Sequence, residues 1–367
     1  MSSLLYSPVI DIAAKLGGAV LSPFLSGPLL LSATYYPEAV RDALASVSAH
    51  LPDALSTYLS LPGLLDSPRF MTGLKVLVGL GVVNKLNQGL NAVAHNSWRL
   101  CAAKGWDNWA DEVAVVTGGS SGIGNDIVRR LAALEIRVAV FDIADLPKEM
   151  DADGARVRFY RCDVTSAESV AAAAEAVRRD LGHPTILVNN AGIANPAPIL
   201  KTSVPFLHKI MGVNLMSMWY TTQQFLPNMV QNNKGHVVTV ASIASFVALA
   251  TAAPYSATKA GALAFHEALA AELKHQYKAP NVLTSVVHPN FVRTPLVADF
   301  SQRLENAGVR MLTADVIAKA VVDQVKSKRG GQLIIPDSAS GISGIRGWPT
   351  WLQEIIRDAV ARGAVKP

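Results

Sequence analysis

The chain has 367 residues, half of them hydrophobic and only 17% charged, with a formal net charge of +5. This length can bury a large core and exceeds one dinucleotide-binding domain, and the composition is oily for a soluble enzyme. Two cysteines, Cys101 and Cys162, exclude a disulfide framework, and the absence of a basic stripe with interleaved aromatic residues argues against a nucleic-acid partner.

The first 105 residues are expected to form an apolar, helical N-terminal extension. The run from 16 to 37 carries no charged side chain and is long enough to cross a bilayer. Glycines and prolines interrupt this run, namely Gly17, Gly18, Pro23, Gly27 and Pro28. A second apolar run, residues 76–83, is too short to span. Two interpretations stay open: a helical extension folded onto the catalytic domain, or a segment attached to a membrane. We favour membrane association without a clean span because of the overall hydropathy, and the mild positive charge also suits anionic lipid.

Three tryptophans, Trp98, Trp106 and Trp109, precede the first expected strand. They are either anchors at a lipid interface or packing that joins the extension to the next domain. That domain is expected to cover residues 106–340 and to carry the chemistry. An amphipathic C-terminal tail, residues 341–367, follows it. Three partners for the apolar face of this tail stay open from the sequence: the extension, a membrane surface and a second subunit.

Between residues 110 and 340, short apolar runs alternate with helical patterns. The expected strands are 113–117, 137–141, 157–161, 185–189, 236–241, 282–287 and 332–335. The clearest helical stretches are 166–181, 205–231 and 255–277. This alternation predicts an α/β fold, with a doubly wound parallel sheet and helices on both of its faces. A ligand is then expected beyond the carboxyl ends of the strands.

The stretch 113–124 predicts a phosphate-binding loop. A β-branched apolar strand ends at Thr117, and a helical pattern begins after a run of glycines and serines. Unpaired N–H groups and the positive dipole at a helix start stabilise a pyrophosphate, and glycines let the backbone approach it closely. The candidate binding residues are Gly118, Ser120, Ser121, Gly122, Ile123 and Gly124.

Asp142 follows the second strand and predicts the choice of cofactor. A carboxylate at this place accepts hydrogen bonds from the two ribose hydroxyls of the adenosine, and it repels a 2′-phosphate. No arginine or lysine between residues 118 and 127 offsets that repulsion. NAD(H) is therefore favoured, and NADP(H) stays possible. A solvated turn aspartate is the alternative interpretation.

Two further strand ends carry candidate cofactor contacts. Asp163 and Val164 close the third strand, where the carboxylate either meets the adenine or caps the next helix. Asn190, Ala191 and Gly192 close the fourth strand with small residues that let the chain pass close to the cofactor. The amides there can also tie neighbouring strands together, so we expect a mostly structural turn that contacts the cofactor.

A serine, a tyrosine and a lysine follow at a spacing that suits proton transfer. Ser242 ends the fifth strand, and Tyr255 and Lys259 are four residues apart, so on a helix they share a face. The pKa of a free phenol is about 10, and a nearby ammonium or a positively charged nicotinamide lowers it. Ser242 is expected to hydrogen-bond the substrate oxygen and stabilise developing charge. No metal site is expected.

These motifs together resemble the short-chain dehydrogenase/reductase superfamily. The resemblance rests on residues 117–124 (Thr-Gly-Gly-Ser-Ser-Gly-Ile-Gly), residues 189–192 (Asn-Asn-Ala-Gly), Ser242 and Tyr255-x-x-x-Lys259. It covers about residues 110–340. It implies a Rossmann-type sheet of about seven strands and hydride exchange between a nicotinamide and an alcohol or carbonyl carbon.

The resemblance implies three further site residues. Asn214 matches a helix asparagine that holds a water linking Lys259 to solvent; the alternative is a core amide that kinks its helix. The backbone of Val292 and the hydroxyl of Thr294 match groups that meet the carboxamide of the nicotinamide. The family commonly has Pro-Gly at residues 289–290, where this chain has Pro-Asn.

The Pro-Asn-Phe-Val of this loop and the apolar extension look like the membrane- and lipid-droplet-associated branch, which includes retinol dehydrogenases and 17β-hydroxysteroid dehydrogenases. The resemblance implies a lipophilic substrate, a location on the endoplasmic reticulum or lipid droplets facing the cytosol, and a homo-oligomer. Residues 295–312 are expected to be the mobile substrate cover. Two alternatives stay open: an NADP(H)-dependent ketone reductase of a biosynthetic pathway, and a non-enzymatic NAD(H)-binding protein of lipid surfaces.

Overall fold

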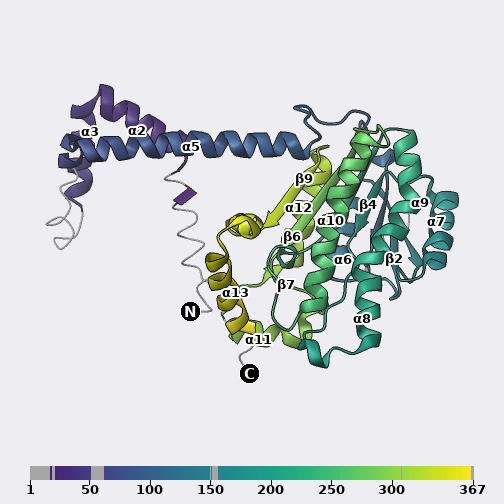
Figure 1. The fold of residues 1–367 in the computed structure, drawn as a ribbon. Coiled ribbons are helices and arrows are strands. Elements are labelled where there is room, and N and C mark those ends of the chain that lie inside the picture. Colours follow the sequence, from purple (N-terminus) through teal and green to yellow (C-terminus); the bar gives the residue numbers. More distant parts are fainter. Residues whose placement is uncertain are drawn as a thin grey trace. The chain divides into compact units, whose positions relative to one another are not determined.

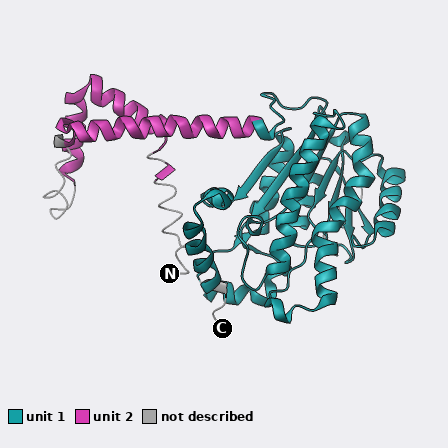
Figure 2. Cartoon of the chain, viewed as in Figure 1, with its two compact units in different colours: residues 1–7, 94–367 teal, residues 8–93 magenta. Residues whose placement is uncertain are grey.

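The chain folds into two compact units. The structure is a computed structural model that describes residues 17–18, 21–50, 62–148, 150, 156–306 and 308–364. Residues 8–93 form the smaller unit and residues 94–367 belong to the larger one (Figure 2). The larger unit begins before the expected boundary at residue 105, because the chain there is already bound within it. Ala103, for example, donates its backbone N–H to Lys328 O at 2.8 Å.

The smaller unit is helical where it is described. It contains α2 (Pro23–Tyr35), α3 (Pro37–Ser48), a 3₁₀ turn (Pro62–Asp66) and most of α5 (Pro68–His95) (Figure 1). We expected Pro28 to break the helix. Instead α2 continues through it, although a proline has no N–H and cannot make the usual helical hydrogen bond. Among the described helices, none combines the length and apolar content needed to cross a bilayer.

The larger unit is built on a seven-stranded parallel sheet in the order β3–β2–β1–β4–β5–β6–β9 (Figure 1). The strands are β1 (Val113–Thr117), β2 (Arg137–Asp142), β3 (Val157–Arg161), β4 (Ile186–Asn189), β5 (Gly235–Val240), β6 (Val282–Pro289) and β9 (Gly331–Ile335). Their apolar, β-branched character fits strands buried on both faces. The predicted Rossmann-type sheet is confirmed. Its order reverses between β1 and β4, which is where such sheets bind ligands.

Helices cover both faces of this sheet. On one face lie α6 (Gly122–Ala132) and α12 (Ala314–Lys326), and on the other lie α7 (Ala167–Leu181), α9 (Ser217–Gln231) and α10 (Ala253–His275). The first core includes Ile127 and Val321, and the second includes Phe225 and Leu269. Each helix places its apolar stripe on the sheet, as a doubly wound fold requires.

The helix predicted over residues 205–231 is divided in the structure. It begins as α8 (Val204–Met211), passes through a π-helical turn (Gly212–Met216) and continues as α9. A π-helical turn inserts one extra residue into a helix, and such turns occur frequently at functional sites. The turn is centred on Asn214, which is fully buried.

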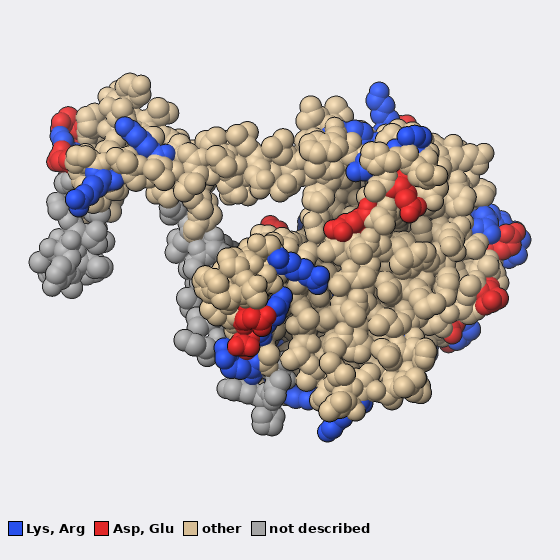
Figure 3. All heavy atoms as spheres, viewed as in Figure 1, with Lys and Arg blue, Asp and Glu red and all other residues tan. Residues whose placement is uncertain are grey.

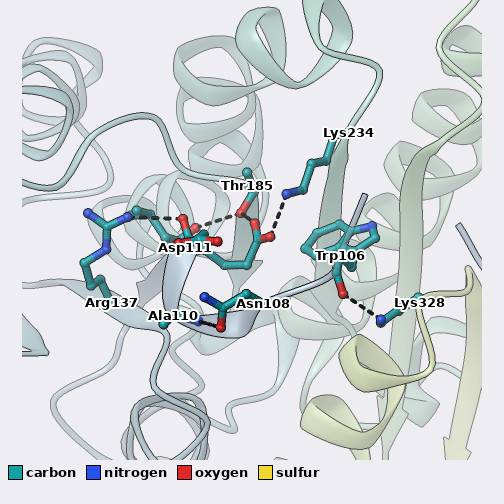
Figure 4. A network of polar contacts seen from close by, with 10 residues as sticks. Trp106, Asn108, Ala110, Asp111, Arg137, Thr185, Lys234 and Lys328 are labelled. Atoms are coloured by element: carbon teal, nitrogen blue, oxygen red, sulfur yellow. Dashed lines mark hydrogen bonds and ion pairs between the residues drawn. The ribbon is translucent and has the colours of Figure 1, made fainter. Parts of the chain in front are cut away.

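A polar network joins the amino ends of four strands (Figure 4). The side chain of Glu112, just before β1, is 1% exposed and pairs with Lys234 at 2.6 Å. The Thr185 hydroxyl, just before β4, donates to the same carboxylate at 2.5 Å. Arg137 of β2 donates to Asp111 O at 3.1 Å. These contacts fix the edge of the sheet opposite to the carboxyl ends, where the predicted site lies.

The three tryptophans before β1 separate into two groups. Trp106 is buried and Trp109 is half-buried, with ring centroids 5.8 Å apart, and Lys328 donates to Trp106 O at 2.6 Å (Figure 4). These two rings are therefore packing residues of the larger unit. Trp98 is 67% exposed and alone retains the character of an interfacial anchor.

The C-terminal tail packs on the larger unit itself, and the partners expected from the sequence (the extension, a membrane or a second subunit) stay predictions. It consists of a 3₁₀ segment, η9 (Asp337–Gly347), and α13 (Thr350–Ala364). Ile345 packs against Phe246 and Val247, in the loop after β5. The Arg346 guanidinium donates to Ser245 O at 3.2 Å and to Phe246 O at 3.3 Å. The tail therefore supports the loop that follows Ser242.

The expected substrate cover is partly helical. It contains the 3₁₀ segment η8 (Pro295–Phe300) and α11 (Ser301–Asn306), and a small parallel sheet of β7 (Val292–Arg293) and β8 (Leu312–Thr313) holds its two ends together. Arg293 and Glu305 form an ion pair across it at 2.7 Å. Its mobility stays a prediction.

Candidate active site

The glycine-rich loop forms a cradle at the start of α6. Gly118 and Gly122 have positive φ angles of 64° and 54°, a conformation that favours glycine. A Cβ at Gly124 would lie 2.1 Å from Gly118 O, so only glycine fits there. Ser121 is the N-cap of α6 but makes no side-chain hydrogen bond to it. The first N–H groups of the helix therefore face the cradle with capacity for an anion.

Asp142 lies beside this cradle at the carboxyl end of β2. One carboxylate oxygen accepts the backbone N–H of Ser120 at 3.0 Å, and the other accepts that of Ala144 at 3.0 Å. The Ser120 hydroxyl donates to Ala144 O at 2.8 Å. A carboxylate has about four acceptor positions. The bound carboxylate is thus held in place and retains capacity for two further donors.

Asp163 and Val164 lie just after β3. Asp163 is not the cap of the following helix. Ser166 is the N-cap of α7, and its hydroxyl accepts the Ser169 N–H at 3.0 Å. Asp163 instead forms a local turn, accepting the N–H and the hydroxyl of Thr165 at 2.9 and 2.7 Å. Asp163 is exposed, and Val164 is buried.

The turn after β4 ties two strand ends together, as its amides suggested. The Asn190 side chain donates to Thr117 O at 3.0 Å and to Gly118 O at 3.1 Å. The Thr117 hydroxyl in turn accepts the N–H groups of Asn190 and Ala191, both at 3.0 Å. A Cβ at Gly192 would lie 3.8 Å from Lys259 Nζ. This turn is therefore bound to the glycine-rich loop and passes close to the lysine.

Ser242, Tyr255 and Lys259 come together at the carboxyl end of β5. Ser242 follows β5, and Tyr255 and Lys259 lie in the first turns of α10. The lysine is buried, its Nζ donates to Val240 O at 2.9 Å, and it lies 5.7 Å from the centre of the Tyr255 ring. The Ser242 hydroxyl accepts the Ala244 N–H at 3.1 Å and lies close enough to the phenol to have a lowering effect on its pKa.

Burial sets the pKa values of this pair. It lowers the pKa of the Lys259 ammonium to about 8. It raises the pKa of the Tyr255 phenol, and the hydrogen bond from Ser242 opposes that rise. The lowering expected from Lys259 together with a positively charged nicotinamide stays a prediction. The Lys259 nitrogen lies away from the Tyr255 ring and is bound to Val240 O. The cost of burying a phenolate therefore outweighs the attraction between that phenolate and the Lys259 ammonium.

Asn214 joins the π-helical turn to the chain beyond β4. Its side-chain oxygen accepts the Ile193 N–H at 2.8 Å, and its nitrogen donates to Ile193 O at 2.9 Å and to the Thr258 hydroxyl at 3.3 Å. The amide thus uses both of its donors and one of its two acceptor positions to hold the backbone near Lys259. These contacts fit the second interpretation from the sequence, in which Asn214 is a core amide at an irregular turn of its helix. A water held at this place stays a prediction.

Val292 and Thr294 lie against the glycine-rich loop. A Cβ at Gly122 would meet the Thr294 Cβ and Cγ2 at 3.3 Å. Val292 is buried in β7, and the Thr294 hydroxyl is 3.4 Å from Val292 O. The Pro-Asn at residues 289–290 makes a regular strand exit, with Asn290 donating its N–H to Ile335 O at 2.8 Å.

Comparison with known proteins decides the family. Residues 112–305, more than half of the chain, match the family described as short chain dehydrogenase. The chain belongs to the short-chain dehydrogenase family. It is therefore an NAD(P)-dependent oxidoreductase that acts on CH–OH groups of a small-molecule substrate.

Several members of this family are similar to the chain in sequence. Dehydrogenase RED2 of Cochliobolus heterostrophus is 40% identical over 182 residues, covering 50% of this chain and 68% of its own length. Estradiol 17-beta-dehydrogenase 11 of Homo sapiens is 33% identical over 198 residues, covering 53% of this chain and 66% of its own length. The matched part of the chain thus spans about two thirds of the length of each of these two relatives. A ligand-free aldohexose dehydrogenase of Thermoplasma acidophilum shares the fold, with a TM-score of 0.53, 24% identity and coverage of 61% of this chain and 92% of that one.

Sequence reasoning missed two residues at this short-chain dehydrogenase site. Arg346 supports the loop after Ser242 from the far end of the chain, and no local pattern marks such a contact. His288 is the second, and its ring contacts the Ser242 carbonyl. A histidine at the carboxyl end of an apolar strand was the available signal.

Proposed function

We propose that the protein is an NAD(H)-preferring alcohol dehydrogenase or carbonyl reductase for a lipophilic substrate, of the retinoid, steroid or fatty-alcohol kind, and that it works at a membrane or lipid-droplet surface facing the cytosol. The observation that carries the chemistry is the convergence of Ser242, Tyr255 and Lys259 beside the glycine-rich loop. Similarity to proteins named estradiol 17-beta-dehydrogenase 11 supports the lipophilic substrate class.

The residues at the carboxyl ends of the strands fit a dinucleotide. The cradle at α6 suits the pyrophosphate, because its glycines let loop and helix pack closely; a Cβ at Gly124 would lie only 2.1 Å from Gly118 O. Asp142 would hold the adenosine ribose. The remaining cofactor contacts are assigned to Gly118, Ser120, Ser121, Gly122, Ile123, Asp163, Val164, Asn190, Ala191, Gly192, Val292, Thr294, Tyr255 and Lys259. When bound, the nicotinamide takes or supplies the hydride.

Tyr255 handles the proton in this proposal. In oxidation, its phenolate takes the substrate's hydroxyl proton while the hydride leaves the same carbon; in reduction, the phenol returns a proton to the carbonyl oxygen. Ser242 donates a hydrogen bond to that oxygen. Because burial raises the pKa of Tyr255, the phenolate needs the help of Ser242 and of nearby positive charge. Lys259 supplies such charge, and Asn214 holds the backbone beside it.

Asp142 tests the cofactor preference. We expect Asp142→Ala to shift the ratio of kcat/KM for NAD⁺ over NADP⁺ by about tenfold or more toward NADP⁺, because a like charge near the 2′-phosphate is removed. Steady-state kinetics with both cofactors measure the ratio. Asp180→Ala, which removes the same charge at the far end of α7, should leave it unchanged. An unaltered ratio in Asp142→Ala would count against an NAD(H) preference set by this residue.

Exposed apolar side chains support contact with lipid. In the smaller unit they include Phe24, Leu25, Leu31, Leu86 and Leu90. In the larger unit, the 3₁₀ turn η5 (Ile199–Lys201) exposes 98% of Leu200 and 74% of Ile199. This turn follows closely on Ile193, which is bound to Asn214 at the site. Large exposed apolar groups of this kind suit a lipid interface.

The charges around η5 favour an anionic surface. Lys201 and Lys209 are exposed there, and no aspartate or glutamate occurs between Asp180 and Glu267. In Figure 3 the face over α8 and α10 is almost free of charged side chains, with basic side chains at its lower edge. Anionic headgroups attract each such lysine by about 1 kcal/mol.

A vesicle experiment tests this surface in the full chain. We expect the double variant Lys201→Glu, Lys209→Glu to bind phosphatidylserine-containing vesicles about tenfold or more weakly than wild type, and phosphatidylcholine vesicles about equally. Co-sedimentation at fixed ionic strength measures both affinities. The double variant Lys274→Glu, Lys278→Glu makes an equal charge change in the last turn of α10 and just after it, and is the control. A larger loss in the control would place the lipid at the opposite edge of the sheet.

A substrate screen tests the function as a whole. Detergent-solubilised full chain is incubated with lipophilic alcohols and NAD⁺, and with the matching ketones and NADH or NADPH, and turnover is followed by NADH or NADPH absorbance. Oxidation of a lipophilic alcohol with NAD⁺ is the expected result. Turnover confined to ketones and NADPH would support the biosynthetic reductase instead. Cofactor binding without any turnover would support the non-enzymatic lipid-surface protein.

A further inference from the structure

His288 lies directly behind Ser242 and is fully buried at the end of β6. Its Nδ1 is 3.0 Å from Ser242 O, and its Nε2 is 3.2 Å from Gln332 Nε2 on β9. Its ring centre lies 4.5 Å from that of Phe246. Both ring nitrogens and one ring face therefore have defined partners, and the ring connects three strands at the edge where the site lies.

The partners of His288 define its protonation state. A carbonyl oxygen only accepts hydrogen bonds, so Nδ1 carries the proton that faces Ser242 O. The amide nitrogen of Gln332 donates, so Nε2 accepts, and the ring is neutral. Burial lowers the pKa of His288 to about 4; the hydrogen bond to Ser242 O acts in the opposite direction, and the charge of Lys259 lowers the pKa further. The other titratable neighbour, His266 on α10, also has its pKa lowered by burial, to about 3.

Ser242 depends on this contact through its backbone, because its hydroxyl accepts the Ala244 N–H at 3.1 Å and is thus bound within the same loop. The Ser242 hydroxyl is 3.5 Å from Pro289 O, at the limit of a hydrogen bond. The Ser242 carbonyl accepts two hydrogen bonds, one from His288 Nδ1 and one from the Ser245 N–H at 3.0 Å. If the hydrogen bond from His288 is removed, the peptide plane after Ser242 can rotate. Such a rotation moves the Ser242 hydroxyl relative to Tyr255.

We propose that His288 is a positioning residue, which holds Ser242 in its working geometry as a neutral imidazole protonated on Nδ1, with Gln332 fixing that tautomer. The proposal rests on the role of Ser242 in the proposed function. It assigns no proton transfer to His288 itself. The buried ring acts only through the Ser242 carbonyl, and it stays neutral over the whole range in which the protein would work.

Two substitutions separate the two ring nitrogens. The amide nitrogen of asparagine lies two bonds from Cβ, like Nδ1, whereas that of glutamine lies three bonds away, like Nε2. We expect His288→Asn to keep its donor on Ser242 O and most of the turnover rate. We expect His288→Gln to leave that carbonyl short of a donor and to lower kcat by about 10–100-fold. KM for NAD(H) should change little in either variant, because the glycine-rich loop is untouched.

Nitrogen NMR of the ¹⁵N-labelled wild-type full chain in detergent tests the tautomer without any substitution. We expect Nδ1 to show the shift of a protonated nitrogen and Nε2 that of an unprotonated one, unchanged between about pH 5.5 and 8.5, since the pKa of about 4 lies below this range. A ring protonated on Nε2 alone, or one that titrates within this range, would overturn the proposal even if a variant failed to fold.

Ser242→Ala distinguishes the two possible failures. If Ser242→Ala turns over at the wild-type rate, the proposed function is wrong at this residue and the role of His288 falls with it. If Ser242→Ala is impaired while His288→Asn and His288→Gln have equal kcat values, the proposed function stands and only the positioning role is overturned. The expected pattern is a low kcat in Ser242→Ala and His288→Gln, with rescue in His288→Asn.

Discussion

Tyr255→Phe is expected to lower kcat by about 10²–10⁴-fold, the range that general acid–base groups contribute. The substitution removes one oxygen from a half-buried side chain and leaves the ring in place beside Lys259. NAD(H) affinity should change little, because the cradle at α6 and Asp142 are untouched. Turnover followed by NADH absorbance and cofactor affinity measured by fluorescence titration separate the two quantities.

Tyr277→Phe is the matched control for this loss. The Tyr277 phenol is exposed near the end of α10 and donates to Glu272 at 3.1 Å, far along the helix from Lys259. It should keep wild-type kcat. Full turnover in Tyr255→Phe would falsify the assignment of proton transfer to this residue. A parallel loss of cofactor affinity would instead mean that the hydroxyl serves binding more than chemistry.

The strands of the sheet could be predicted from sequence because their signals are local. Each β-branched run, such as that ending at Thr117, lies between turn residues, and burial on both faces makes the run continuously apolar. The strand ends then place Asp142, Ser242 and the helix with Tyr255 at one edge of the sheet. The chemistry of these residues follows from their type and spacing, so most of the candidate site was available without coordinates.

Long-range contacts could not be predicted in this way. Arg346 binds the loop after Ser242 across a hundred residues of chain, and Lys328 donates to Trp106 O across 222 residues. The pKa of Tyr255 is a similar case. Spacing predicts that Lys259 is near, but the direction of the shift depends on how deeply the phenol is buried and where the ammonium points.

Gly124→Ala is expected to have the second large effect, on stability and cofactor binding together. The new Cβ would lie 2.1 Å from Gly118 O and 2.5 Å from Asn190 Nδ2. Gly118 O accepts a hydrogen bond from Asn190, so the displacement breaks one of the hydrogen bonds that join the ends of β1 and β4. Overpacking costs about 1–3 kcal/mol, which corresponds to a fall in Tm of up to about 10 °C in a domain of this size.

NAD(H) affinity in Gly124→Ala should fall about tenfold or more, since the same displacement closes the cradle at the start of α6. Differential scanning calorimetry and fluorescence titration measure the two effects. Gly341→Ala is the control, because a Cβ there meets no heavy atom within 4 Å, and its effect should stay within about 0.5 kcal/mol. A Gly124→Ala protein that melts like wild type but binds NAD(H) weakly would show that the loop yields locally. One that binds NAD(H) normally would mean that the pyrophosphate does not lie on this helix start.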